Sequence, residues 1–304
     1  MRISVIIPTY NAEAYIDCLL SVLEKQSAAI DEIIIIDSAS SDNTVAIVKE
    51  HGKKIVEINR AEFNHGTTRD KAFMESTGNI VCFLTQDALP TNEFYIENLT
   101  KPIREDSRIA MVGGRQVARN DAGRIEKYVR LFNYKETSQI WDRRDIDRLG
   151  IKAFFISDSC SAYSRSAYFS VGGFEKNILT NEDMEIAAKF LEAGYKLAYQ
   201  ADAEVYHSHS YTLFEQFRRN FDVGAFLSMH SKYFSGSRIK SEGMKMLRDV
   251  FGRLVKEMHF AEAFYCIINF FARFLGNFTG LRYKAFPLPL VKGMSGQRAW
   301  WEGK

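Results

Sequence analysis

Residues 32–37 read EIIIID, and this short apolar run that stops at an acidic residue decides the fold class. An unbroken run of isoleucines is typical of a strand buried on both faces, as in a parallel sheet covered by helices. Alternating strands and helices form βαβ units, so the pattern predicts an α/β fold with a mostly parallel sheet. The segments that make up this alternation are strand-like runs at 3–7, 54–58 and 80–84 and helix-like spacing at 12–26, 44–51 and 67–76.

The later part of the chain changes character near residue 210. Up to that point strand and helix patterns continue less regularly, whereas beyond it apolar residues repeat at helical spacing with Lys and Arg opposite them. We therefore expect a body over 1–210 and a basic amphipathic helical extension over 211–304. The segments concerned are strand-like runs at 111–118, 153–163, 196–201 and 205–209, and helix-like spacing from 181–183 onward and at 213–233, 244–258 and 260–278.

Composition and charge bound the function. The chain has 304 residues, of which 46% are hydrophobic and 26% charged, and this excludes a disordered or collagen-like protein. Residues 211–304 hold 15 Lys and Arg against 7 Asp and Glu, so the extension favours an anionic partner, either a membrane surface or nucleic acid. Its basic residues are spread over amphipathic helices without a nucleic-acid motif, and we therefore expect no nucleic-acid partner.

The sequence also predicts the compartment. The four cysteines lie far apart with no CxxC pair, which favours reduced, buried thiols and argues against a zinc or redox site. We see no signal peptide and no uncharged apolar stretch of the roughly 18 residues that a spanning helix needs. These features predict a cytoplasmic protein without a membrane-spanning helix.

Polar residues follow the first, second and fourth strand-like runs. Ligands bind at the carboxyl ends of parallel strands, so these positions form the expected site. A carboxylate there can accept a hydrogen bond from the N–H of a nucleobase imide, the role we assign to Asp37. The alternative is that these residues only cap helices and turns. The candidate contacts to the nucleotide are Pro8, Thr9, Asn11, Asp37, Ser38 and Gln86.

A metal site is predicted from Asp87 and His207. A nucleotide diphosphate is usually neutralised by Mg²⁺ or Mn²⁺ held by one or two carboxylates and phosphate oxygens, and imidazole is a common additional ligand. Asp87 follows a buried strand, and His207 and His209 share one face if they lie on a strand. The alternative is a turn-forming Asp87 and two histidines without a metal.

Two further segments carry candidate chemistry. Asp183 follows a Gly-Gly turn at the start of a helix, where it can act as general base toward a sugar hydroxyl or simply favour the helix dipole. The loop FNHGTTRD at 63–70 enters a helix and could bring Asn64 and Arg69 to a phosphate or base, or form a plain turn.

The order and spacing of these motifs resemble the inverting family 2 glycosyltransferases over about residues 2–210. The resemblance rests on SVIIPTYN at 4–11, IDSASSDNT at 36–44, Gln86-Asp87, and GGF at 172–174 with Glu182-Asp183. The loop at 63–69 and HSHSY at 207–211 are more similar to the bacterial rhamnosyltransferase branch.

The resemblance implies an A-type glycosyltransferase fold, Rossmann-like, with a nucleotide-sugar half over about 1–110 and an acceptor half over about 111–210. It implies that the Pro8-Thr9 strand end and Asp37 hold the base, Asp87 and His207 the metal, and that Asp183 deprotonates the acceptor. Two departures stand out. The Asp-X-Asp motif reads Gln86-Asp87-Ala88, and the second Asp of the usual Asp-Asp-Gly-Ser element is Ser38.

The implied activity is transfer of a sugar, with L-rhamnose from dTDP-β-L-rhamnose favoured, onto a cell-surface polysaccharide or a lipid-linked glycan precursor. The extension is then expected to lie on the anionic inner face of the cell membrane, to pack on the body, or to form a homodimer contact. A catalytically weak nucleotide-sugar binding protein and a transferase for another UDP- or dTDP-sugar are the alternatives. A dinucleotide oxidoreductase is disfavoured because no GxGxxG follows the first strand.

Overall fold

The computed structural model describes residues 1–234 and 239–303, without the side chains of 239–241, and divides into two compact units. The first unit comprises Met1–Val117, Tyr134–Ile178 and Glu182–His207. The second comprises Ala118–Asn133, Leu179–Asn181 and Ser208–Lys304, so two short segments of the body join the C-terminal helices.

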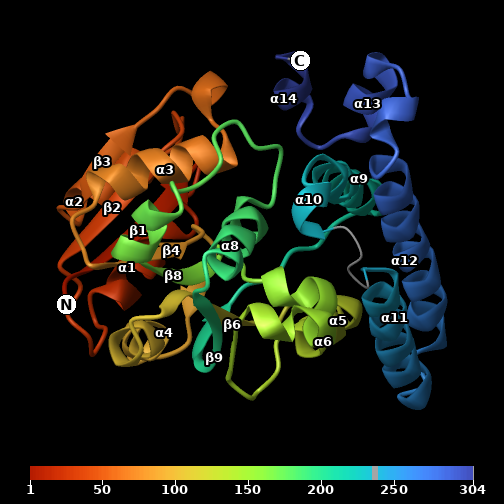
Figure 1. Cartoon of the computed structure of the whole chain (residues 1–304), viewed down its shortest axis with the longest axis horizontal. Helices are drawn as coiled ribbons and strands as arrows, with labels where there is room; N and C mark the ends of the chain where they lie inside the picture. Colours follow the sequence, from red (N-terminus) through yellow and green to blue (C-terminus); the bar gives the residue numbers. More distant parts are fainter. Residues whose placement is uncertain (235–238, 304) are drawn as a thin grey trace. The chain divides into compact units, whose positions relative to one another are not determined.

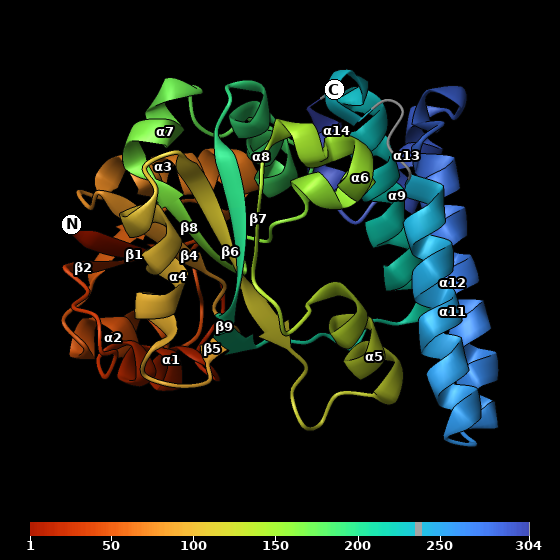
Figure 2. The same cartoon turned by 60° about the horizontal axis from the view of Figure 1, so that its bottom comes forward.

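A nine-stranded sheet forms the centre of the first unit, in the order β3-β2-β1-β4-β8-β6-β9-β5 with β7 beside β9 (Figures 1 and 2). The first four strands are parallel, as predicted, because helices cross between them. Beyond them the sheet is mixed: β8 runs antiparallel to β4 and β6, and β9 runs parallel to β6. The strands are β1 (Ile3–Thr9), β2 (Glu32–Asp37), β3 (Lys54–Glu57), β4 (Ile80–Leu84), β5 (Leu89–Pro90), β6 (Ile109–Val117), β7 (Gln139–Trp141), β8 (Cys160–Ser164) and β9 (Lys196–Tyr206).

Helices cover both faces of this sheet, so each central strand is buried on both sides (Figure 2). One face packs with α1, α2 and α4 in an aliphatic core that contains Ile35 and Leu99. The other face carries aromatic packing, in which Phe83 contacts Phe73 of α3 and Tyr163 contacts Phe190 of α8. The helices of this unit are α1 (Ile16–Leu23), α2 (Thr44–Glu50), α3 (His65–Glu75), α4 (Tyr95–Glu105), α6 (Ile146–Leu149), α7 (Arg165–Ser170) and α8 (Glu182–Glu192), with 3₁₀ turns at Arg60–Glu62, Arg143–Asp145 and Gly150–Phe154.

Two sequence-based boundaries are wrong. The expected strand over 153–163 begins only at Cys160, because Gly150–Phe154 forms a 3₁₀ turn that buries Ala153 and Phe154 without pairing in the sheet. The separate runs expected at 196–201 and 205–209 form one strand, β9, which ends at Tyr206. Alternation between buried and exposed positions continues through its middle, so the polar residue Asp202 interrupts the hydrophobicity but not the strand.

The second unit is helical within its described residues, and Figure 1 shows its long helices α11 and α12 side by side. Helices α9 and α12 approach each other closely: a Cβ on Gly280 would overlap the carbonyl oxygen of Phe221, and one on Gly276 would overlap that of Phe217. None of the helices described in residues 1–234 and 239–303 is long and apolar enough to cross a membrane. The helices are α5 (Arg124–Asn133), α9 (Leu213–Met229), α10 (Ser231–Phe234), α11 (Ile239–Lys256), α12 (Phe260–Gly280), α13 (Leu288–Met294) and α14 (Arg298–Glu302), with a 3₁₀ turn at Tyr283–Ala285.

Candidate active site

The carboxyl ends of β1 and β2 hold the first group of predicted residues together. Thr9 lies opposite Asp37 in the parallel pairing and donates from Oγ1 to Asp37 Oδ1 at 2.8 Å. The backbone N–H and the hydroxyl of Ser40 also donate to this buried carboxylate, at 2.8 and 2.6 Å. The Ser38 N–H donates to the Thr9 carbonyl, so both strand ends form one rigid polar edge.

Asn11 joins the two loops that follow these strands. Its φ of 49° lies in the left-handed region, which asparagine tolerates better than most residues. Its N–H donates to the Ser40 hydroxyl at 2.8 Å, and its Oδ1 accepts from the Ser41 N–H at 2.9 Å. Pro8, one position before Thr9, lies opposite Ile36 within the pairing. Of the predicted nucleotide contacts, those from the first two strands are therefore adjacent.

Gln86 fastens the first loop to the end of β4. Its side-chain amide pairs with the backbone of Tyr10 in both directions: Oε1 accepts from the Tyr10 N–H at 2.9 Å, and Nε2 donates to the Tyr10 carbonyl at 3.2 Å. An aspartate could not donate the second of these hydrogen bonds. Gln86, which stands where the Asp-X-Asp pattern has its first aspartate, thus fixes the loop that follows β1.

Asp87 and His207 lie beside each other, with 3.5 Å between Asp87 Oδ1 and His207 Nε2. The other ring nitrogen, Nδ1, is 2.9 Å from Oε1 of Gln116, a buried residue of β6. An amide oxygen can only accept a hydrogen bond, so the proton of the neutral ring is on Nδ1. The nitrogen beside Asp87, Nε2, then carries the lone pair. A carboxylate oxygen and an oriented imidazole nitrogen form a donor set that could hold a divalent metal ion.

The loop at 63–70 has a structural role at its start. Asn64 caps α3, accepting from the N–H groups of Gly66 and Thr67 at 3.2 Å each, and it donates to the Ile178 carbonyl at 2.7 Å. A Cβ on Gly66 would overlap the carbonyl oxygen of Glu175, so only glycine permits this close approach. The motif therefore clamps α3 to the segment that leads into α8.

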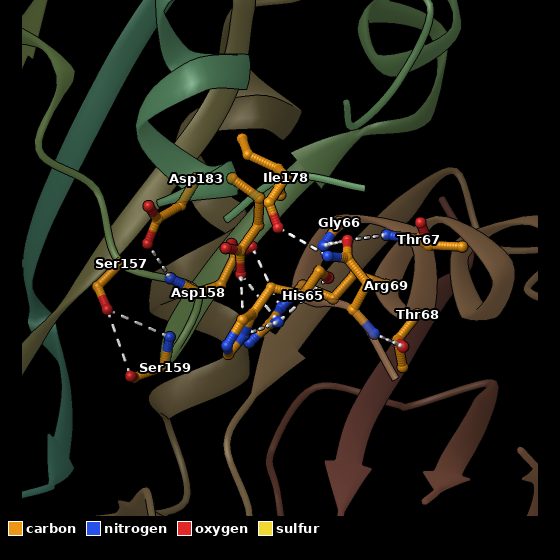
Figure 3. Close-up of polar contacts among 12 residues, drawn as sticks. His65, Gly66, Thr67, Thr68, Arg69, Ser157, Asp158, Ser159, Ile178 and Asp183 are labelled. Atoms are coloured by element: carbon orange, nitrogen blue, oxygen red, sulfur yellow. Dashed lines mark hydrogen bonds and ion pairs between the residues drawn. The ribbon is translucent and has the colours of Figure 1, made fainter. Parts of the chain in front are cut away.

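Arg69 extends from α3 into a cluster of three carboxylates (Figure 3). Its Nη1 lies 2.8 Å from Oε1 of Glu182, and its Nε lies 3.4 Å from Oδ2 of Asp158. Asp158 Oδ1 accepts from the hydroxyls of Ser161 and Tyr163 at 2.7 and 2.6 Å. We predicted Arg69 near a phosphate or base, and in the structure its guanidinium pairs with buried carboxylates.

Asp183, the predicted base, lies at the edge of this cluster. Its Oδ2 accepts from the backbone N–H of Asp158 at 3.3 Å (Figure 3). Its Oδ1 accepts from the N–H of Met184 at 2.7 Å. The side chain keeps partial exposure, whereas Glu182 and Asp158 are buried. Asp183 is therefore the carboxylate of the three that a substrate could reach.

The pKa values of Asp183 and Glu182 are shifted in opposite directions. Burial and the negative charges of Glu182 and Asp158 raise the pKa of Asp183 well above its usual value. Burial also opposes ionisation of Glu182, but the Arg69 guanidinium and His65 lower the pKa of that residue overall. Glu182 is thus a permanent anion that balances Arg69, while Asp183 has the higher proton affinity that suits a general base.

A series of hydrogen bonds connects the three predicted acidic positions along one edge of the sheet. Thr9 donates to Asp37, and the next residue, Tyr10, pairs with Gln86, which precedes Asp87. The Thr85 N–H donates to the Ser159 carbonyl at 3.3 Å, and the adjacent Asp158 N–H donates to Asp183. The side chains predicted at the ends of β1, β2 and β4 and at the start of α8 therefore share one rim.

Two residues of this rim have no role in the sequence-based prediction, namely Gln116 and Asp158. Asp158 lies 89 positions from Arg69, and Gln116 contacts a histidine 91 positions later in the chain. No local pattern marks Gln116, and Asp158 has a single local signal. The one available signal is a carboxylate inside the apolar run at 153–163, because buried acids require a partner.

Comparison with known proteins agrees with this geometry. The profile of glycosyl transferase family 2 matches residues 4–171. The chain is 36% identical over 306 aligned residues to the O-antigen chain rhamnosyltransferase RfbN of Salmonella typhimurium, covering 99% of this chain and 96% of that protein. It is also 36% identical to the O-antigen chain rhamnosyltransferase WbaN of Salmonella anatum, covering 98% and 95%.

Solved structures share the fold. The mannosyltransferase PcManGT from Pyrobaculum calidifontis, in complex with GDP-Man and Mn²⁺, aligns with a TM-score of 0.58 at 18% identity, over 99% of this chain and 85% of that one. S. aureus TarS 1–349 in complex with UDP-GlcNAc aligns with a TM-score of 0.56 at 18% identity, over 93% and 92%. The expected A-type glycosyltransferase fold is confirmed. Together with the profile match and the full-length relatives, this means that the chain belongs to glycosyl transferase family 2.

Proposed function

We propose that this glycosyltransferase moves L-rhamnose from dTDP-β-L-rhamnose to a hydroxyl of a bacterial cell-surface polysaccharide or its lipid-linked precursor, with inversion. The observation that carries the proposal is 36% identity along almost the whole chain to two O-antigen chain rhamnosyltransferases. The identity extends through the acceptor half and the helical extension, beyond the motifs that bind any nucleotide. Donor and acceptor classes are therefore both expected to be shared.

In the proposed reaction, an acceptor hydroxyl oxygen attacks the anomeric carbon while the bond from that carbon to the diphosphate oxygen breaks. The acceptor proton passes to the Asp183 carboxylate, and dTDP leaves with the bonding electron pair. The raised pKa and partial exposure of Asp183 support this role. A single displacement inverts the anomeric centre, so a β-linked donor gives an α-linked product.

Asp87 and His207 are the residues that would hold a divalent cation, Mg²⁺ or Mn²⁺. The pairing of a carboxylate with an imidazole oriented by Gln116 supports this assignment. When bound, such a cation neutralises the charge that develops on the leaving diphosphate. The main chain at His207 is fixed by its backbone N–H, which donates to the Val117 carbonyl at 2.8 Å.

The nucleoside is assigned to the edge formed by Pro8, Thr9, Asn11, Asp37 and Ser38, with Gln86 fixing the loop beside it. The buried Asp37 carboxylate, already oriented by Thr9 and Ser40, supports recognition of a base N–H. Asn64 and Arg69 are assigned to positioning: the first orders the start of α3, and the second balances the charge of Glu182 beside the base.

The proposal is tested by a donor panel read as thermal shift and as turnover, with and without Mn²⁺. The panel compares dTDP-rhamnose with UDP-glucose, UDP-galactose and GDP-mannose. We expect dTDP-rhamnose to stabilise the protein most and to be the sugar transferred to an O-antigen repeat acceptor, with an α-linkage visible by NMR. Preferential transfer from another donor would overturn the rhamnose assignment, and shifts without turnover on any acceptor would favour a binding protein.

A further inference from the structure

Helix α12 of the second unit exposes its apolar side to solvent, whereas an ordinary surface helix exposes its polar side. Among its described residues, every exposed position is apolar or aromatic, and none carries a charge or an amide. Phe264 and Phe271 are 68% and 61% exposed. Soluble proteins rarely expose a continuous row of large apolar side chains without a function for it. The exposed face of α12, defined here as its outer face, consists mainly of Phe260, Phe264, Ile267, Phe271, Phe274 and Phe278.

Three polar residues of α12 have partners within the unit instead. Asn269 is buried, and Arg273, on the same side, donates from Nε to its Oδ1 at 2.8 Å. Glu262 pairs with Arg124 of α5, with 2.8 Å between Oε1 and Nη1. The opposite side also carries Gly276 and Gly280 against α9. The inner side of this helix also places Cys266 and Phe270 in a buried cluster with Val250 and Leu254 of α11. The packing of the unit therefore uses the inner side of α12 and leaves the outer face largely exposed.

The part of the chain that contains most of α12 and the segments after it is basic. Residues 263–301 contain five Lys and Arg and no Asp or Glu. Arg282 and Lys284, both exposed, follow directly on the C-terminal end of α12. Basic side chains at the margin of an apolar face can reach lipid phosphates while the aromatic residues enter the acyl boundary. Each such charge near an anionic membrane contributes about 1 kcal/mol.

We propose that the outer face of α12 lies in the interface of an anionic phospholipid bilayer, with the helix axis along the membrane plane. The helix is about 30 Å long at 1.5 Å per residue. The helix does not cross the bilayer, because the side that carries Asn269 and Arg273 must stay packed within the unit. This inference deepens the proposed function, on which it rests only for the idea that the acceptor is carried on a lipid.

A second copy of the chain is a poorer occupant of the same face. A symmetric contact would bring the acid-free segment 263–301 of one copy close to that of the other, so charges of the same sign would repel. Phospholipid phosphates provide the opposite charge over the whole face. The charge pattern therefore selects the membrane over self-association.

The test is sedimentation of the full chain with sucrose-loaded vesicles, without any sugar donor or acceptor. We expect binding to vesicles of phosphatidylcholine with phosphatidylglycerol, and weaker binding to phosphatidylcholine alone or at high salt. The double variant Phe264→Glu/Phe271→Glu should lose at least about ten-fold in apparent affinity, since two aromatic side chains no longer leave water. Arg282→Gln/Lys284→Gln should lose about five-fold per charge on anionic vesicles at low salt.

The matched control is Phe94→Glu/Ile140→Glu, which places the same charges at apolar residues of the first unit that are 49% and 56% exposed. It should bind vesicles as the parent chain does. Equal binding by the Phe264/Phe271 variant, with an unchanged thermal unfolding curve, would overturn the proposal. So would a wild-type chain that ignores anionic vesicles but forms a dimer, by light scattering, that the Phe264/Phe271 variant abolishes. Transfer to a water-soluble acceptor, measured separately, tests the proposed function alone.

Discussion

The guanidinium of Arg69 lies 2.8 Å from Oε1 of Glu182, the residue that precedes the proposed base in α8. Both groups are buried, and Asp158 adds a second carboxylate 3.4 Å from the same guanidinium. The pairing keeps a permanent negative charge next to Asp183 without leaving that charge uncompensated. The proton affinity of the base is therefore set by residues that do not themselves reach the substrate.

Asp183→Asn should lower kcat by about 10²–10⁴-fold while leaving the affinity for the donor within a few fold. The same change should also stabilise the fold at neutral pH, because the amide has no charge to bury beside Glu182 and Asp158. Calorimetric donor titration, turnover and urea unfolding measure the three effects. Asp202→Asn, at an exposed position of the same unit, is the control and should change none of them.

The pH dependence follows from the same group. Only the ionised form of Asp183 can accept the proton, so kcat/KM should fall as the pH drops through its raised pKa, well above the usual value of 3.8. The unfolded chain ionises at that usual value. The difference in stability between wild type and Asp183→Asn should therefore be absent below it and should grow as the pH rises toward the native pKa. A pH-independent stability difference would contradict this environment.

Arg69→Met should destabilise the first unit by about 3–5 kcal/mol, since it leaves Glu182 and Asp158 buried without their cation. Adding Glu182→Gln should recover part of this loss, which a role in packing alone would not produce. Urea unfolding measures both variants. Arg108→Met, which removes a 69% exposed arginine from a surface ion pair with Asp106, should change the free energy of unfolding by less than about 0.5 kcal/mol.

Gln116→Leu should raise the Mn²⁺ concentration needed for half-maximal turnover by about 10–100-fold, although Gln116 is not a proposed ligand. The reason is that His207 loses the acceptor at 2.9 Å that fixes its tautomer and ring orientation. Asp87→Ala should remove the dependence of dTDP affinity on the cation altogether. A wild-type enzyme that binds dTDP equally with and without Mn²⁺ would exclude the metal from the mechanism.

Gly280→Ala should destabilise the second unit by about 1–3 kcal/mol, because its methyl group would overlap the Phe221 carbonyl of α9. The control is Gly252→Ala in α11, where a Cβ meets nothing within 4 Å. That change should stabilise the helix by roughly 0.5–1 kcal/mol, the difference in helix propensity between the two residues. Chemical denaturation of the full chain, followed by circular dichroism, compares them.

The sequence predicts what depends on neighbours along the chain and misses what depends on distant partners. Isoleucine runs identify the buried strands, and the polar residues that end them mark the rim, since both are local patterns. Arg69, Asp158 and Glu182 form one cluster only because α3, the turn before β8 and α8 meet in space. The sequence likewise does not predict which side of α12 is exposed, because the apolar residues have the same helical spacing whichever side faces water.

The hydrogen bonds along the rim have a consequence for how enzymes of this kind can diversify. Tyr10, Thr85, Ser159 and Asp158 take part in them through main-chain groups. A change of side chain at Tyr10, Thr85 or Ser159 therefore leaves the hydrogen bonds that place Asp37, Asp87 and Asp183 along the rim in position. Selection can exchange these residues to suit a new sugar or acceptor while the reaction geometry is inherited intact.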